Sequence, residues 1–338
     1  MRSFKEQGMA MKQGNSQTMP RVFWKKEMGI FIALIAIFAF FSALSPYFFN
    51  LDNLINVLRQ VSLLGIIAMG MSLVIVTGEI DLSVGSLYGA SAILAGVLLV
   101  SGFPLWLAMI LGLATGTVFG LLNGLLISYG RIPALIVTLG MMNIARGLAL
   151  IFSGGRVVNL SHRTVADPNL DFFLFLGQGK LWNIPVMVIV FIAVAILVYL
   201  LFGKTILGFR MRAVGGSKNA ARASGINERV IKVAAFGILG FLSALAGLLN
   251  ISFLGNVQGT TGQGMELNAI AAVIIGGTSL AGGEGTIVGT MIGVLIMGIL
   301  NNGIILLGVS PFWQMTIIGI VIIFAVALDI WTRKGSRS

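Results

Sequence analysis

Long runs of apolar residues, separated by short polar or glycine-rich segments, dominate this chain. A helix needs about 20 mainly apolar residues to cross a bilayer, and only helices or closed barrels satisfy their backbone hydrogen bonds in hydrocarbon. The runs are too long for barrel strands, and they do not alternate as such strands do. We therefore predict an all-α, polytopic membrane protein with about ten transmembrane helices. The predicted helices are residues 28–45, 51–77, 84–100, 105–128, 133–153, 183–203, 231–253, 266–281, 286–307 and 312–331.

The basic residues predict the orientation of these helices. Of the 22 Lys and Arg residues, 17 fall in segments that ten helices place on one side: the two tails, the turn at Arg131 and residues 204–232. Membrane proteins keep Lys-rich and Arg-rich loops on the cytoplasmic side. We therefore expect both termini to lie in the cytoplasm.

This topology divides the chain into a membrane domain and two cytoplasmic tails, of which we expect the first, basic tail to be disordered. A long outer loop and a long cytoplasmic loop interrupt the membrane domain. The first tail, the membrane domain and the last tail are residues 1–27, 28–331 and 332–338, and the two loops are 154–182 and 204–230.

The overall composition agrees with a membrane protein. Hydrophobic residues make up 57% of the chain and charged residues 10%, whereas soluble domains are about one quarter charged. A net charge of +11 would suggest a nucleic-acid partner in a soluble protein. Here membrane orientation accounts for the basic residues, so we expect contact with lipid and none with nucleic acid.

Glycine recurs at helical spacing in two predicted helices. Gly112, Gly116, Gly120 and Gly124 follow one another every four residues. Such small-residue faces allow two helices to approach closely. We expect tight packing at this face, and sliding during gating is a further reading.

The chain carries no machinery of its own for chemistry or for energy supply. It has no cysteine and one histidine, His162, and its eleven Asp and Glu residues fall in tails, loops or helix ends. Too few groups remain for a catalytic or metal-binding constellation, and no Gly-rich phosphate loop follows a strand. We expect no enzyme activity, no metal and no cofactor bound by this chain, so that active transport needs a separate motor.

Residues 204–230 are the expected docking surface for such a motor. They form the longest internal cytoplasmic segment and carry many charges. The alternative is a solvated loop that only sets the orientation of the protein in the membrane.

Five motifs in order along the chain resemble one transporter family. They lie at residues 65–71 (GIIAMGM), 78–85 (GEIDLSVG), 138–147 (TLGMMNIARG), 213–227 (AVGGSKNAARASGIN) and 276–283 (GGTSLAGG). Together they resemble the permeases of the ribose-type branch of bacterial ABC importers, over about residues 28–330.

The resemblance implies a set of partners and a place in the cell. It implies two permease subunits that form the path in the bacterial inner membrane, a cytoplasmic ABC ATPase that uses ATP and Mg²⁺, and a periplasmic or lipid-anchored sugar-binding protein. It makes 154–182 and the outer turns, including 254–265, candidate contacts for that binding protein. It also makes 213–227 the segment that couples to the ATPase. The expected coupling residues are Gly215, Gly216, Ser217, Ala221, Ser224, Gly225, Ile226 and Asn227.

Three charged residues in the matched motifs have more than one reading. Glu79 and Asp81 lie in the turn before the third helix, where they could pair with cations of the ATPase or cap that helix, and Ser83 is an equal candidate for the cap. Arg146 could snorkel to the interface, pair with Glu266 or line the path.

A path for sugar needs hydroxyl and amide groups more than charges. The candidates within the predicted helices are Asn123, Thr138, Asn143, Asn301, Asn302 and Gln314. Such residues also bridge one helix to another. The leading hypothesis is a permease that imports ribose or a related monosaccharide by alternating access. An ion-coupled carrier or facilitator is the alternative.

Overall fold

The computed structural model describes residues 19–310, with side chains from residue 28, and the scattered residues 313, 316, 317, 319, 320, 323 and 327. Most of the predicted helix 312–331, the candidate Gln314 and the tail 332–338 lie outside the described residues.

The described chain is almost entirely helical. Two short antiparallel pairs are its strands: β1 (Val158–Asn159) with β4 (Asn256–Val257), and β2 (Lys180–Leu181) with β3 (Ile184–Pro185). The helices are α1 (Met19–Leu44), α2 (Leu51–Val76), α3 (Val84–Val100), α4 (Leu105–Ser128), α5 (Ala134–Ser153), α6 (Leu170–Gln178), α7 (Val186–Lys204), α8 (Ile206–Gly216), α9 (Lys218–Ala223), α10 (Glu228–Leu254), α11 (Met265–Ile275) and α12 (Ile287–Leu306).

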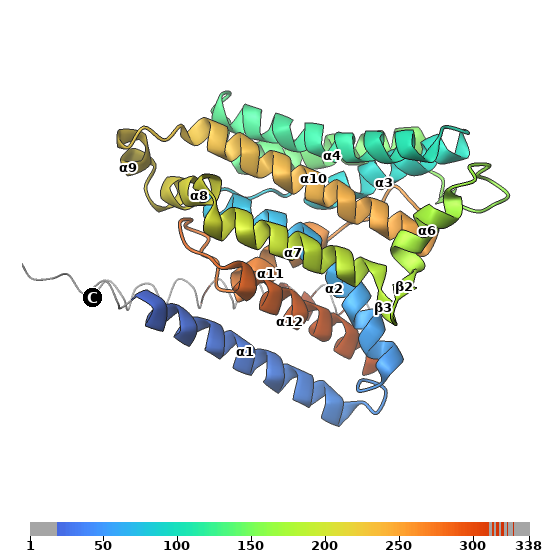
Figure 1. The fold of residues 1–338 in the computed structure, drawn as a ribbon, viewed down its shortest axis with the longest axis horizontal. Helices are drawn as coiled ribbons and strands as arrows, with labels where there is room; N and C mark the ends of the chain where they lie inside the picture. The colour runs from blue at the N-terminus through green and yellow to red at the C-terminus, as the bar shows by residue number, and fades with distance from the viewer. Residues whose placement is uncertain are drawn as a thin grey trace, which may run out of the picture.

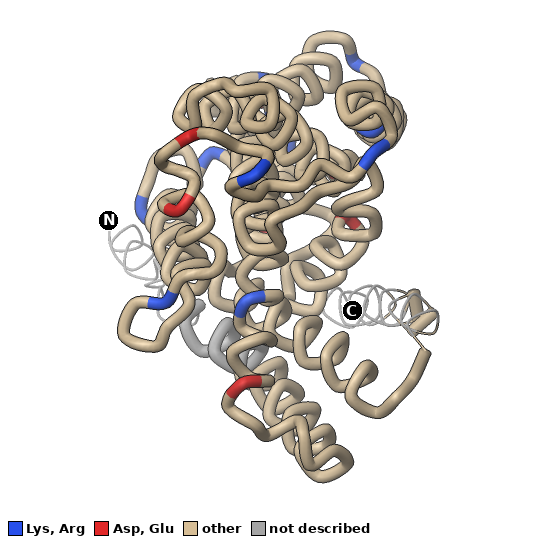
Figure 2. The backbone as a smooth tube through the Cα atoms, turned by 90° about the vertical axis from the view of Figure 1, so that its right-hand side faces the viewer, with Lys and Arg blue, Asp and Glu red and all other residues tan. Residues whose placement is uncertain are grey.

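Six of these helices, α2, α4, α5, α7, α10 and α12, are long and apolar enough to cross a membrane. The apolar part of α1, together with α3 and α11, is shorter. Figure 1 shows the long helices side by side along the longest axis, with α8 and α9 at one end and α6, β2 and β3 at the other. Figure 2, turned by 90°, shows these helices closer to end-on as a bundle that is mostly uncharged. The predicted class of helical membrane protein is confirmed.

Helix α2 is the centre of the bundle, and residues 61–76 are buried without a break. It contacts α7, α10, α11 and α12. Two glycines permit close contact, because a Cβ at Gly65 would overlap the ring of Phe191 and one at Gly70 would lie 2.9 Å from Cα of Leu239. The GIIAMGM motif is therefore the core of the fold.

The glycine face of α4 packs against α10. A Cβ at Gly116 would overlap the carbonyl oxygen of Gly240, and one at Gly120 would lie 3.0 Å from Cα of Gly240. Backbone thus meets backbone along this pair of helices. The expectation of tight packing at this face is confirmed.

Two predicted boundaries are wrong. Helix α1 begins at Met19, so residues 19–27 of the predicted disordered tail are helical. The predicted helix 266–281 ends at Ile275, and residues 276–286 are not helical. Gly277, Gly282 and Gly283 have φ between 79° and 84°, a conformation that ends a right-handed helix but that a hydropathy pattern does not register.

Candidate coupling face and polar sites

The predicted loop 204–230 folds into two short helices, and a polar side chain caps the start of each helix in this region. Thr205 Oγ1 accepts from Gly208 N at 3.3 Å at the start of α8, and Ser217 Oγ accepts from Ala220 N at 3.3 Å at the start of α9. Asn227 Oδ1 accepts from Arg229 N at 3.1 Å at the start of α10. These caps supply hydrogen bonds that the first turns lack. Gly225, at φ 76°, makes the turn between α9 and α10.

The eight expected coupling residues therefore lie together at one end of the bundle, in two groups. Ala221 is buried, and Ile226 packs against the hydrophobic core, so these two anchor the segment. Gly215 faces the bundle. The exposed members are Gly216, Ser217, Ser224, Gly225 and Asn227.

Helix α8 meets the bundle at a contact between backbones, which we call the α8 junction: residues 76–78, 215–216 and 282–283. Gly283 N donates to Val76 O at 2.8 Å. A Cβ at Gly215 would overlap Val76 O and lie 2.5 Å from Gly283 N. No other residue type fits at Gly215 without displacing two segments. Because of these contacts, a movement of α8 displaces the end of α2 and the loop that follows α11.

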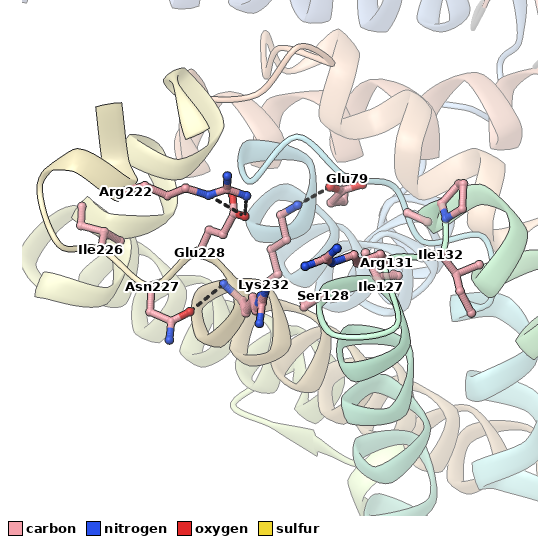
Figure 3. Close-up of a pocket in the computed structure, with 13 residues that line it drawn as sticks. Glu79, Ile127, Ser128, Arg131, Ile132, Arg222, Ile226, Asn227, Glu228 and Lys232 are labelled. Carbon is pink, nitrogen blue, oxygen red and sulfur yellow. Dashed lines mark hydrogen bonds and ion pairs between the residues drawn. The ribbon is translucent and has the colours of Figure 1, made fainter. Parts of the chain in front are cut away.

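Three ion pairs join α9, α10 and the turn after α2. Lys232 Nζ lies 2.5 Å from Glu79 Oε1, and Lys218 Nζ lies 3.5 Å from the same oxygen. Arg222 pairs with Glu228, its Nε donating at 3.1 Å. Figure 3 shows the Glu79–Lys232 and Arg222–Glu228 pairs beside a cavity of about 630 Å³. Arg131 lines this cavity from the turn between α4 and α5. Glu79 therefore already has cationic partners within its own chain.

Asp81 is fully buried and holds its own turn together. Its Oδ1 accepts from Ser83 N at 2.7 Å and from Ser83 Oγ at 2.6 Å, and its Oδ2 accepts from Asn123 Nδ2 at 3.2 Å. Neither expected cap is found, because Ser83 has no side-chain capping bond and Asp81 bonds the N–H of Ser83 itself. Asp81 thus ties the start of α3 to α4.

Arg146 bonds to α3 from the middle of the bundle. Its Nη2 donates to Ser86 Oγ at 3.1 Å. Within the described residues, none of the ion pairs joins Arg146 to Glu266. Arg146 therefore has a neutral partner in this structure.

The five described candidates for the sugar path differ in their burial and in their hydrogen-bond partners. Asn123 and Thr138 are buried, with Thr138 Oγ1 donating to Ala134 O at 2.9 Å. Asn302 is 7% exposed and exchanges amide hydrogen bonds of 2.9 and 3.0 Å with Asn53. Asn143 is exposed, and its amide bonds only to Leu139 O of its own helix. Asn301 is partly exposed, and Gln314 lies outside the described residues.

Sequence reasoning missed three residues that the fold brings to these sites. Lys232 and Arg131 counted only as charges that set the orientation, and Glu266 only as a possible partner of Arg146. Lys232, with 7% exposure, is a buried cation. Its position as the second residue of the predicted helix 231–253 is the one local signal that it needs a partner.

The described residues thus form a helical membrane bundle with a charged end built from short helices. The family model for the permease component of the branched-chain amino acid transport system matches residues 53–326. The chain is 45% identical over 311 residues to the ribose import permease protein RbsC of Bacillus subtilis (strain 168), covering 92% of this chain and 94% of that protein. It is 42% identical over 306 residues to RbsC of Escherichia coli (strain K12), covering 90% and 94%. It is 36% identical over 320 residues to the galactose/methyl galactoside import permease protein MglC of Salmonella typhimurium, covering 90% and 94%. No solved structure matches the chain significantly.

The chain therefore belongs to this permease family and is a non-catalytic, multi-pass membrane subunit of a bacterial ABC importer. The resemblance predicted from its five motifs is confirmed.

Proposed function

We propose that this chain forms, with a second copy, the path by which ribose or a related monosaccharide enters the cell by alternating access. The relatives named above are ribose and galactose permeases, although the family model carries the name of amino-acid transport. The observation that carries the coupling part of the proposal is the α8–α9 hairpin, which is exposed on one side and locked to α2 on the other.

The orientation follows from the charges at the two ends. Lys218, Arg222, Arg229 and Lys232 cluster at the end with α8 and α9. We place this end and both termini in the cytoplasm, because basic residues gather there. The end with α6 then faces outward, and the loop 154–182 that contains α6 is the surface offered to a sugar-binding protein.

The partner ATPase docks on the α8–α9 hairpin in this proposal. Ser217, Ser224, Gly225 and Asn227 present an exposed face, and the α8 junction passes the movement of that face into the bundle. ATP and Mg²⁺ are used in the partner, and this chain holds neither.

The second copy faces α5 in this proposal. Gly140 and Gly147 have open space at the Cβ position, and the amide of Asn143 lies exposed between them. An exposed amide in a membrane helix is costly against lipid, whereas small residues favour contact between helices or a polar path. Asn143 is accordingly our first candidate for the sugar path.

Reconstitution tests this function. Proteoliposomes that contain the chain, its ATPase and its sugar-binding protein should accumulate labelled ribose only when ATP is present on the side of α8 and α9. Galactose serves as the competing monosaccharide. Accumulation driven by an ion gradient in vesicles that contain the chain alone would contradict the proposal and favour a secondary carrier.

A further inference from the structure

The loop between α10 and α11 runs into the bundle instead of staying at its outer end. Beyond β4 it passes α5 and reaches the start of α3: a Cβ at Gly259 would overlap the side chain of Leu150, and one at Gly262 would overlap the carbonyl oxygen of Gly85. We call residues 258–264 the inward loop.

The depth of the inward loop follows from the helices beside it. Ser86, next to Gly85, bonds to Arg146. Arg146 lies seven residues before Ser153, the last residue of α5, or about 10 Å along the helix at 1.5 Å per residue. Ser86 lies 14 residues before Val100, the last residue of α3, or about 21 Å along that helix. The inner part of the inward loop therefore lies well inside a hydrocarbon layer of about 30 Å.

The inward loop is not helical, and some of its polar side chains are exposed. Thr260 and Gln263 are exposed, whereas Gly259 is buried. Non-helical backbone at membrane depth occurs only where it is covered by protein or lines a water-filled cavity, because lipid satisfies no backbone hydrogen bonds. Exposed hydroxyl and amide groups at this depth thus point to water.

Glu266 holds the inner part of this loop, and Arg146 holds the start of α3 beside it. Glu266 Oε1 accepts from Gly264 N at 3.1 Å, and its Oε2 lies against Gly85. Glu266 Oε2 and Arg146 Nη1 are both buried atoms without a hydrogen-bond partner among the described residues. Ionisable groups inside a membrane protein are costly and concentrate along transport paths.

We propose that the inward loop is a wall of the transport path at membrane depth, where Thr260 and Gln263 contact the hydroxyl groups of the sugar, Glu266 holds the loop in place and Arg146 holds the neighbouring start of α3. This inference rests on the transport function proposed above. The sequence predicted 254–265 only as an outer turn that contacts the binding protein. The proposal gives part of this segment a second role, which is to recognise the sugar inside the path.

Because the natural chain has no cysteine, single cysteines report on this surface without background. The test compares Gln263→Cys with Leu197→Cys, an exposed apolar position in the interior of α7 (66%). The probe is a charged, water-soluble methanethiosulfonate, applied to the complete complex in proteoliposomes. Because the thiolate is the reactive form and hydrocarbon suppresses it, we expect Gln263→Cys to react about tenfold faster or more.

We also expect reaction at Gln263→Cys to stop ATP-driven ribose uptake, and Thr260→Cys to behave in the same way. The melting temperature in detergent shows that each unreacted variant has folded, and the effect of reaction is scored on the uptake that this variant retains. If the natural complex transports ribose but Gln263→Cys stays unreactive, or reacts without loss of uptake, the inward loop does not line the path. If the natural complex shows no ATP-driven uptake of either sugar, the function proposed above fails instead.

Discussion

Two glycine-rich segments flank α11, and they differ in how they meet the rest of the bundle. At the inner end, Gly282 and Gly283 press against the backbone of α8 and of the turn after α2. At the other end, the inward loop touches α3 through Gly262 but leaves Thr260 and Gln263 exposed. One segment is closed by contacts between backbones, and the other combines a close contact with an open polar surface.

The difference shows two uses of glycine in one permease. In the α8 junction, glycine removes side chains so that two segments move as one. In the inward loop, glycine lets the backbone turn at φ 85° at Gly262 while neighbouring side chains face outward. Helix α11 joins the two and has 11 residues, about 16 Å at 1.5 Å per residue. It thus connects the proposed docking face to the proposed wall of the path.

The largest effect is expected from a substitution in the α8 junction, the segment that contacts between backbones close. Gly215→Ala places a Cβ against Val76 O and Gly283 N. Overpacking of a core costs about 1–3 kcal/mol, and here backbone must move. We expect ATP-driven uptake to be lost and the melting temperature in detergent to fall. The matched control is Gly216→Ala, whose Cβ meets open space; equal loss in both variants would contradict the role of the junction.

The next prediction tests the docking of the ATPase at Gly225 separately from the α8 junction. Gly225 lies at φ 76° with open space at its Cβ position. Gly225→Asp should abolish uptake, because it adds charge to the docking face, while insertion into the membrane stays intact. Gly225→Asn has nearly the same shape, tolerates this backbone conformation and adds no charge, so it should retain much of the uptake. Uptake and sugar-stimulated ATPase activity are measured for both variants. Normal activity of Gly225→Asp in both assays would refute the docking site.

A smaller effect is expected where the turn after α2 is tied to α10. Glu79→Gln leaves Lys232, with 7% exposure, without its anionic partner at 2.5 Å. Removing one partner of a buried pair costs about 3 kcal/mol, so thermal unfolding in detergent should shift downward and uptake should decrease. The double variant Glu79→Leu/Lys232→Met should recover stability, since the one cation that it leaves without this carboxylate partner, Lys218, is exposed. A double variant that unfolds as early as Glu79→Gln would show that shape, not charge, matters here.

The smallest effect is expected in the loop 154–182, at the end of the bundle with α6. The N–H groups of Asn169 and Leu105 each donate to Asp167 at 2.7 Å, and these bonds lower the pKa of this carboxyl below its ordinary value of 3.8. A group with a lowered pKa stabilises the folded state above its ordinary pKa, and the contribution is lost as pH falls through the folded value. Asp167→Asn should therefore speed proteolysis of residues 154–182 slightly at pH 7 and make no difference once the pH is well below 3.8. Faster cleavage of the variant at that low pH as well would contradict this role.

The sequence predicted the motifs and helix caps of the candidate site but not its long-range contacts. The motif at 213–227 predicts coupling residues that the fold gathers at one end of the bundle, and the polar residues Ser217 and Asn227 are recognisable helix caps. Its contact with α2 was hidden, because Gly215 and Val76 are far apart in the chain. For Arg146 the sequence suggested snorkelling, pairing with Glu266 or lining the path, and in the fold its side chain bonds to Ser86.

The sequence by itself determined the membrane class, the positions of the long helices and the charged end. The reason is that partitioning between lipid and water depends on the length of an apolar segment and on the charges beside it, and both are local properties of the chain. Tertiary structure decided where helix gives way to loop inside the bundle. Hydropathy counts Leu280, Ala281 and the glycines of 276–286 as apolar, although the positive φ of Gly277 ends α11 at Ile275. It also decided that the polar loop 258–264 enters the membrane domain, since the cost of that polar backbone depends on α3 and α5, which the chain brings beside it only on folding.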